Sequence, residues 1–354
     1  MPQSSRPLLP LHPLRLSRRQ LVQAGAAALA MAAAPAIVRA QSQPRVTLRF
    51  SSSMVADQNA AHFVWFESLQ QQLKASAGDA VKIDYFPNNQ LGKESDVVQQ
   101  VKVGSVDMMV SGSSIFATIC PELGMLDLGY LFDNYAHVAR ALDGPTGNSL
   151  NEMLQKSTGC SILTWASHFS ARSVYTKLPV RSLAEIKGVK LRVLPTPAFI
   201  ETFKAMGAIP TPIPFGELYM AAQTGVVDGF EHDAATVLAS KLDEVVKSCW
   251  LTEHLFSPMV VVMGKRGLDK IPADLRPAFN KAVAAATQKQ RAIAGEKGAG
   301  AVDELKRKGL SFYAMSAADR SSVHKTMESG LWAAFAKQYP PTAPLFAAIN
   351  QARG

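Results

Sequence analysis

The 354-residue chain lacks the motifs that most enzyme classes require. Its seven histidines are scattered, and none belongs to an H-E-x-x-H motif. There is no G-x-S-x-G elbow, no P-loop and no G-x-G-x-x-G after an expected strand. These absences count against a zinc peptidase, a serine hydrolase, an NTPase and a dinucleotide-dependent enzyme. We therefore expect no catalytic residues, no cofactor and no metal.

Cysteine is also scarce, and the three residues of this type show no C-x-x-C spacing. An odd number leaves at least one thiol unpaired within a single chain. We expect Cys120, Cys160 and Cys249 to be small buried residues, with one disulfide as the alternative in an oxidising compartment.

Long hydrophobic runs and a strong charge are missing from most of the chain. Beyond residue 40, no stretch offers about 18 uninterrupted apolar residues, so we expect a soluble protein that does not span a membrane. The net charge is +9, but the first 40 residues contain five arginines and no acidic residue. The excess beyond them is modest and forms no basic stripe, which disfavours nucleic-acid binding.

The first 40 residues have the three parts of an export signal. Residues 1–19 are basic and proline-rich, residues 24–38 form an alanine-rich apolar run, and Val38-Arg39-Ala40 suits a signal peptidase. Ser17-Arg18-Arg19-Gln20-Leu21-Val22 resembles a twin-arginine export motif. A general secretory signal is the alternative. Either route predicts a periplasmic protein cleaved after about Ala40.

Strand and helix patterns alternate along the remaining chain, and the length suggests about two domains. Residues 46–52, 81–86 and 107–111 are expected strands, and helices are expected between them, one ending near Gly78 and one over residues 95–103. This order predicts an α/β layer architecture with largely parallel pairing. A second series of strands is expected at 161–166, 190–193 and 259–263, with helices at 198–206 and 216–224 and mostly helix from 272 to about 309.

Four segments together resemble a DctP-type solute-binding protein of a tripartite ATP-independent periplasmic (TRAP) transporter. Their order and spacing match across nearly all of the mature chain. They are Tyr85-Phe86-Pro87-Asn88-Asn89-Gln90-Leu91-Gly92 with Gln99 to Asp107, Lys187-Gly188-Val189-Lys190-Leu191-Arg192-Val193, Ala205 to Phe215, and Glu217 to Glu231.

The resemblance implies a two-lobed, periplasmic-binding-protein-like α/β fold with interlobe crossings and a long helix spanning both lobes. It places lobe I at residues 46–169 plus 258–298, and lobe II at 170–257 plus 299–354. It also implies that the protein captures a small organic carboxylate for the small and large TRAP membrane subunits. An exported enzyme, and a ligand sensor or scavenger, are the alternative functions. A sugar acid, a dicarboxylate and a keto acid all remain open as ligands.

Arg192 is the first candidate for the ligand site. It lies in an expected strand between Leu191 and Val193, where a charge is costly without a partner. In the family this position holds an arginine that binds the ligand carboxylate, and the planar guanidinium fits a carboxylate through two parallel hydrogen bonds. The alternative is a structural ion pair, for instance with Glu217 or Asp228.

The resemblance suggests further ligand contacts. Arg172 can be a second ligand arginine or a solvated loop residue. His232 stands where relatives commonly carry an asparagine, and if it contacts the ligand, affinity should change between about pH 5.5 and 8. Gly112 replaces an acidic residue of sialic-acid-binding relatives, which argues against sialic acid. The other expected ligand residues are Phe215, Ser113, Ser114, Trp165 and His168.

Overall fold

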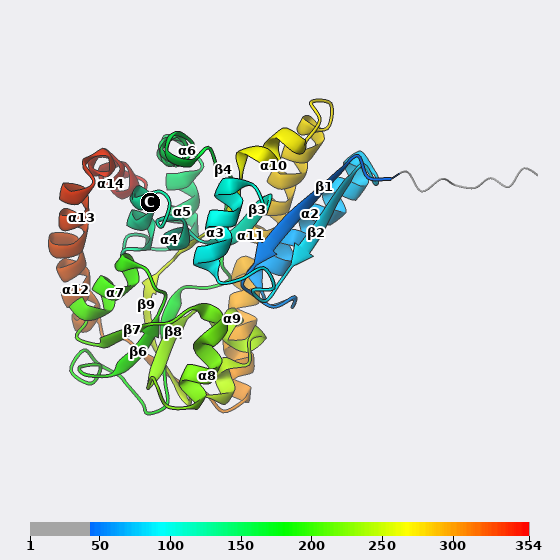
Figure 1. Cartoon of the computed structure of the whole chain (residues 1–354). Helices are drawn as coiled ribbons and strands as arrows, with labels where there is room; N and C mark the ends of the chain where they lie inside the picture. Colours follow the sequence, from blue (N-terminus) through cyan, green and yellow to red (C-terminus); the bar gives the residue numbers. More distant parts are fainter. Residues whose placement is uncertain (1–42, 354) are drawn as a thin grey trace, which may run out of the picture. The chain divides into compact units, whose positions relative to one another are not determined.

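Two β-sheets organise the part of the chain that the computed structural model describes, residues 43–353 (Figure 1). The expected export signal and its cleavage site lie outside the described residues. The first sheet has the strand order β2-β1-β3-β10-β4, and the second has the order β11-β9-β5-β8-β6-β7.

The strands agree closely with several sequence predictions. The first sheet contains β1 (Val46–Ser52), β2 (Val81–Phe86), β3 (Met108–Gly112), β4 (Ser161–Ser167) and β10 (Pro258–Met263). The second contains β5 (Arg172–Thr176), β6 (Lys190–Val193), β7 (Ile209–Pro212), β8 (Gly229–His232), β9 (Ser248–Leu255) and β11 (Ser311–Ala314).

Strand pairing is mixed, with parallel and antiparallel neighbours in both sheets. β1 pairs in parallel with β2 and β3, as the strand–helix alternation predicts. However, β10 is antiparallel to both β3 and β4, and β5 is antiparallel to both β8 and β9. These antiparallel pairs involve β4, β5, β9 and β10, the strands at which the chain crosses from one sheet to the other.

Helices flank the sheets and connect them. They are α2 (Ala61–Ala77), α3 (Glu94–Val103), α4 (Ser113–Phe116), α5 (Tyr135–Leu142), α6 (Pro145–Thr158), α7 (Pro197–Ala205), α8 (Leu218–Gln223), α9 (Ala234–Ala239), α10 (Lys265–Lys270), α11 (Arg276–Arg307), α12 (Ala317–Thr326), α13 (Ala333–Gln338) and α14 (Ala343–Gln351). Short 3-10 turns are η1 (Pro121–Asp127), η2 (Phe215–Glu217), η3 (Leu242–Glu244) and η5 (Pro340–Thr342), and the π-helical segment is η4 (Met327–Trp332).

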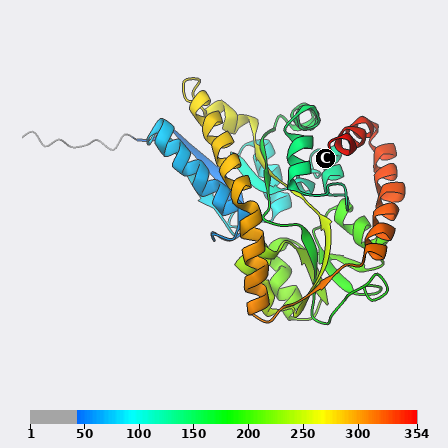
Figure 2. The ribbon, with the colours of Figure 1, turned by 180° about the vertical axis from the view of Figure 1, so that it is seen from behind.

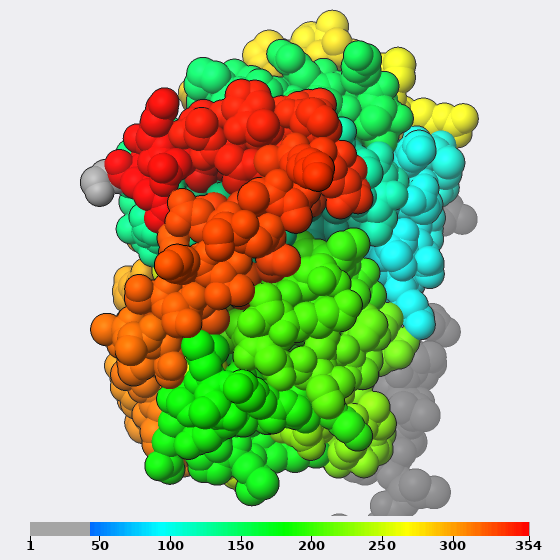
Figure 3. All heavy atoms as spheres, turned by 90° about the vertical axis from the view of Figure 1, so that its left-hand side faces the viewer, coloured from blue at the N-terminus to red at the C-terminus, as the bar shows by residue number. Residues whose placement is uncertain are grey.

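The 32-residue helix α11 spans both halves of the described chain (Figure 2). It packs against α2 and β4 beside the first sheet and against α9 beside the second. The C-terminal helices then run over another face (Figure 3), where η4 contacts α7 and α14 contacts α6. The expected long helix spanning two lobes is therefore confirmed. Within the described residues, no helix combines the length and apolar character needed to cross a membrane.

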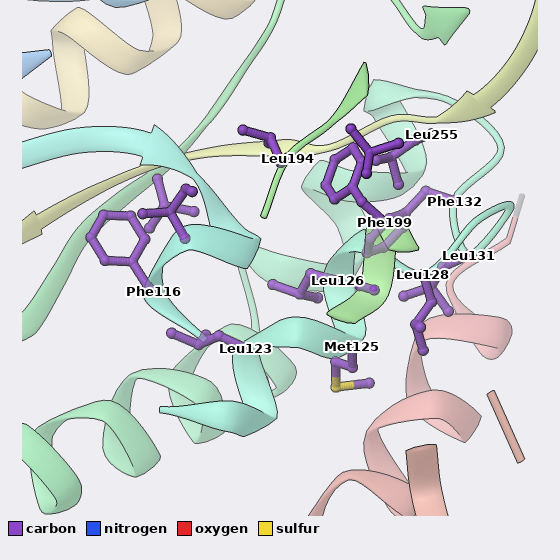
Figure 4. Close-up of a cluster of buried hydrophobic side chains, with 14 of the residues drawn as sticks. Phe116, Leu123, Met125, Leu126, Leu128, Leu131, Phe132, Leu194, Phe199 and Leu255 are labelled. Carbon is purple, nitrogen blue, oxygen red and sulfur yellow. The ribbon is translucent and has the colours of Figure 1, made fainter. Parts of the chain in front are cut away.

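The apolar core continues from one sheet to the other. Phe132, Phe199 and Leu255 lie together in one buried cluster, although they come from elements on different sides (Figure 4). In the described structure, the two halves therefore bury apolar surface against each other. Cys120, Cys160 and Cys249 are free and buried, as expected.

Candidate ligand-binding cleft

A small cavity lies between the two sheets, where several strands end and the chain crosses. Its volume is about 20 Å³. That is room for little more than one water molecule, so an organic acid enters only if the surrounding elements separate. The cavity is lined by Ser53, Met54, His62, Glu94, Ser111, Gly112, His168, Arg172, Leu194, Phe215, His232 and Ser257.

Arg192 lies in β6 and is fully buried; it is not among the residues that line the cavity, but Phe215, on which it packs, is. Its Nε donates to the carbonyl oxygen of Ile213 at 2.7 Å, and its guanidinium carbon lies 5.9 Å from the ring centre of Phe215. Its Nη1 and Nη2 have no hydrogen-bond partner among residues 43–353. The alternative ion pair with Glu217 or Asp228 is absent from this part of the chain, since Glu217 pairs with Lys93 and Asp228 accepts from the Lys190 backbone.

An unpartnered buried guanidinium is energetically unfavourable, and the pKa of Arg192 reflects this. Burial lowers the pKa from 12.5 to about 10, which leaves the side chain charged near neutral pH. In the described part of the chain, the N–H groups of two buried nitrogens, Nη1 and Nη2, lack acceptors, and the positive charge lacks a counter-ion in hydrogen-bond contact. A carboxylate is the group that satisfies both at once.

Arg172 lines the cavity but is already paired. It is the first residue of β5, and its Nε and Nη2 donate to the two carboxylate oxygens of Glu231 at 2.5 and 2.7 Å. Burial would raise the pKa of Glu231, but the charge and hydrogen bonds of Arg172 outweigh it and lower the pKa to about 2. Of the two predicted ligand arginines, Arg192 therefore has the uncompensated charge.

His232 lines the cavity at the end of β8, with Phe215 packed against it at 5.4 Å between ring centres. Its Nδ1 lies 2.9 Å from a carboxylate oxygen of Asp233. Burial and the nearby charge of Arg172 lower the pKa of His232 despite this neighbour. His232 should therefore gain its proton at a lower pH than a free histidine does. We expect ligand affinity to be independent of pH above neutral pH, and any change caused by His232 to occur at lower pH.

Two further histidines meet at the cavity. The rings of His62 and His168 are 5.7 Å apart, and both residues line the cavity. Burial lowers both pKa values, that of His168 to about 4, so both rings are neutral at pH 7. The Nε2 of His62 and the Nδ1 of His168 are buried without partners inside the described chain. Each is available to donate to, or accept from, a ligand hydroxyl.

The two serines predicted to contact the ligand, Ser113 and Ser114, lie in different environments. Ser113 donates to Asp127, which also accepts from Ser257 at 2.5 Å, and Ser257 lines the cavity. Ser114 instead lines a separate cavity described below. Trp165 lies in β4, within the apolar core, and is not among the residues that line the cleft.

Asp127 provides a test of this buried network. Burial raises the pKa of Asp127 to about 6, against the effect of the serine hydrogen bonds. In the unfolded chain, the carboxyl of Asp127 ionises at a lower pH than in the folded chain. The fold therefore loses stability as the pH rises from about 4 to 6. The free energy of unfolding of wild type, relative to Asp127→Asn, should fall by about 2–3 kcal/mol between pH 4 and 7 in denaturant titrations. A difference that stays constant over this pH range would contradict the prediction.

Sequence reasoning missed the acidic member of the cleft, Glu94. It begins α3 and is buried, and its Oε1 accepts from Ser53 at 2.9 Å and from Ser111 at 2.6 Å. The only available signal was its place just after the turn at Gly92, which is compatible with any helix start. Lys93, its neighbour, forms an exposed 2.6 Å ion pair with Glu217 that joins the two sides outside the cavity.

The two-sheet fold with a cavity between the sheets is that of a solute-binding protein. The chain belongs to the bacterial extracellular solute-binding protein family 7 (DctP), which matches residues 52–338. Members of this family are extracytoplasmic binding components of transporters and are not enzymes.

Particular relatives support the assignment. The chain is 30% identical over 307 residues to the 2,3-diketo-L-gulonate-binding periplasmic protein YiaO of Escherichia coli, covering 86% of this chain and 92% of that protein. The sugar-acid-binding protein DctPAm of Advenella mimigardefordensis, in complex with galactonate, superposes with a TM-score of 0.82 at 25% identity, covering 88% and 99%. A TRAP solute-binding protein from Polaromonas sp., bound to D-erythronate, gives 0.80 at 26% identity, covering 87% and 99%.

Proposed function

We propose that this protein captures a small sugar acid, a hydroxylated monocarboxylate, and delivers it to the membrane subunits of a TRAP transporter. The observation that carries the proposal is Arg192, whose two terminal nitrogens are buried without partners within residues 43–353, behind the cavity residue Phe215. A ligand carboxylate would accept from both nitrogens and compensate the charge.

The charges around the cavity favour one carboxylate over two. Arg172 is neutralised by Glu231, so Arg192 supplies the uncompensated positive charge of the described cleft. Glu94 adds a carboxylate that would repel a second ligand carboxylate but accept from ligand hydroxyls. Ser53, Ser257 and the neutral histidines offer further hydroxyl partners. The relatives named for 2,3-diketo-L-gulonate, galactonate and D-erythronate bind molecules of this kind.

Binding would proceed by closure of two lobes, with residues 46–169 plus 258–298 in lobe I and residues 170–257 plus 299–354 in lobe II. Separation admits the ligand, and closure removes the arginine–carboxylate pair from water, where it strengthens. Phe215 would pack against the ligand's carbon skeleton, and Arg172 and His232 would border it. Export and cleavage after about Ala40 would bring the protein to the periplasm, where closed lobes can meet the small and large membrane subunits.

Titration calorimetry with matched acids tests the ligand class. Galactonate and D-erythronate should bind at least tenfold more tightly than succinate, because the second carboxylate of succinate faces Glu94. Glu94→Gln should reduce the difference in affinity between the sugar acids and succinate. The amide accepts hydrogen bonds from ligand hydroxyls more weakly, and it no longer repels the second carboxylate of succinate. The control Glu253→Gln lies outside the cleft and should leave the difference unchanged. Preferential binding of succinate by wild type would overturn the monocarboxylate assignment, and failure of every organic acid to bind would overturn the proposed function.

A further inference from the structure

A second, larger cavity lies beside the cleft, with a volume of about 420 Å³. Gly112 and Leu194 line the cleft, and Ser114 and Thr196, two residues further along the same two connections, line this cavity. The size is within the range of small-molecule sites. Its walls come from three separate parts of the chain: α4 with η1, the start of α7, and η4 with α13.

The walls are mostly apolar, but two hydroxyls in them are unsatisfied. Leu128, Leu331 and Phe335 supply large apolar surfaces. Ser114 and Thr196 are 0% and 2% exposed, and the hydroxyl oxygen of each lacks a hydrogen-bond partner within residues 43–353. Buried polar groups in folded proteins are normally paired, so both hydroxyls have unused hydrogen-bonding capacity, which a side-chain rotation would direct to a polar ligand in the cavity.

The charges distinguish this cavity from the cleft. Among the described residues that line it, Glu201 carries a carboxylate and none carries a cationic group. An organic anion would therefore meet repulsion without compensation. A polar group that both donates and accepts, such as a ligand hydroxyl, suits the serine and threonine hydroxyls.

We propose that this cavity is a second binding site, for a small uncharged molecule with an apolar body and a hydroxyl group. The molecule would contact α4 beside the first sheet, α7 beside the second, and α13 of the C-terminal segment. Its binding does not depend on the identity of the organic acid in the cleft.

Three probes of similar shape test the site: p-cresol, toluene and 4-methylbenzoate. We expect p-cresol to bind the purified full-length protein with a dissociation constant of about 0.1–1 mM. Toluene, which lacks the hydroxyl, should bind up to about tenfold more weakly, and 4-methylbenzoate should not bind in this cavity. Methyl NMR should show p-cresol shifts at Leu128 and Leu331 that exceed those at Leu194 in the cleft.

Matched variants separate binding from folding. Ala334 is exposed on α13 and lines the cavity, so Ala334→Trp should abolish p-cresol binding, whereas Ala333→Trp on the same helix should not. The double variant Ser114→Ala, Thr196→Val should keep its melting temperature and bind p-cresol no better than toluene. Equal binding to wild type and Ala334→Trp, equal affinity for p-cresol and 4-methylbenzoate, or no shift at Leu128 and Leu331 would each overturn the proposal.

Discussion

Replacement of Arg192 by alanine should weaken organic-acid binding by about 3–5 kcal/mol, a loss of about two to nearly four orders of magnitude in affinity. The variant leaves the bound carboxylate buried without its cation. Arg192→Lys should also bind poorly, since an ammonium cannot reproduce two parallel hydrogen bonds. Calorimetry with galactonate measures the loss. Arg181→Ala is the matched control, because Arg181 is exposed and packs on Tyr313 away from the cleft.

The same position should show an opposite effect on the unliganded fold. A pKa that burial lowers from 12.5 to about 10 corresponds to roughly 3 kcal/mol of destabilisation by the charged form. This penalty applies in full below about pH 10 and is relieved above it. Arg192→Met, which keeps the side-chain volume without the charge, should therefore be at least as stable as wild type. A binding loss below tenfold in Arg192→Ala would contradict the role of this residue.

Replacement of Glu231 by glutamine should destabilise the fold by about 3–5 kcal/mol. The pair with Arg172 is fully buried, and the variant leaves two uncompensated cations, Arg172 and Arg192, near one another. Urea denaturation without ligand measures the change. The control Glu253→Gln removes an exposed pair with Arg320 and should cost less than about 1 kcal/mol.

The Glu231 effect also has a defined pH dependence. A carboxyl pKa lowered from 4.5 to about 2 contributes stability that is present above about pH 4.5 and is lost as the pH falls towards 2. Arg172→Met combined with Glu231→Leu should recover much of the stability, because neither charge is left buried alone. Equal losses in the free energy of unfolding for Glu231→Gln and Glu253→Gln would contradict the prediction, because the buried pair would then contribute no more stability than the exposed one.

Local sequence patterns predicted the strands that they describe well. Residues 46–52 and 81–86 alternate apolar and polar side chains, and both form strands with the predicted bounds. Other strands carry no such signal. β7 reads Ile-Pro-Thr-Pro and lies at a sheet edge, where proline is tolerated, whereas two prolines within four residues otherwise suggest a loop. β8 has four residues, too few for a period to be recognised.

The cleft was only partly predictable for a different reason. Arg172 and Arg192 are both cations beside apolar residues, and no local pattern tells which of them has a protein partner. That choice depends on the antiparallel register of β5 and β8, which brings Glu231 beside Arg172. The burial of Glu94 likewise depends on how α3 docks. The contacts of His232, Ser113 and Trp165 with ligand stay predictions until a complex is measured.

The position of β10 has a consequence for how the protein is made. Strand β10 is synthesised about 90 residues after β4 yet lies between β3 and β4 in the first sheet. A nascent chain that ends before residue 258 therefore exposes two strand edges that have no neighbour to pair with. The first sheet therefore cannot finish pairing before β10 is made, so truncated products should aggregate and chaperones should engage the chain until late in translation.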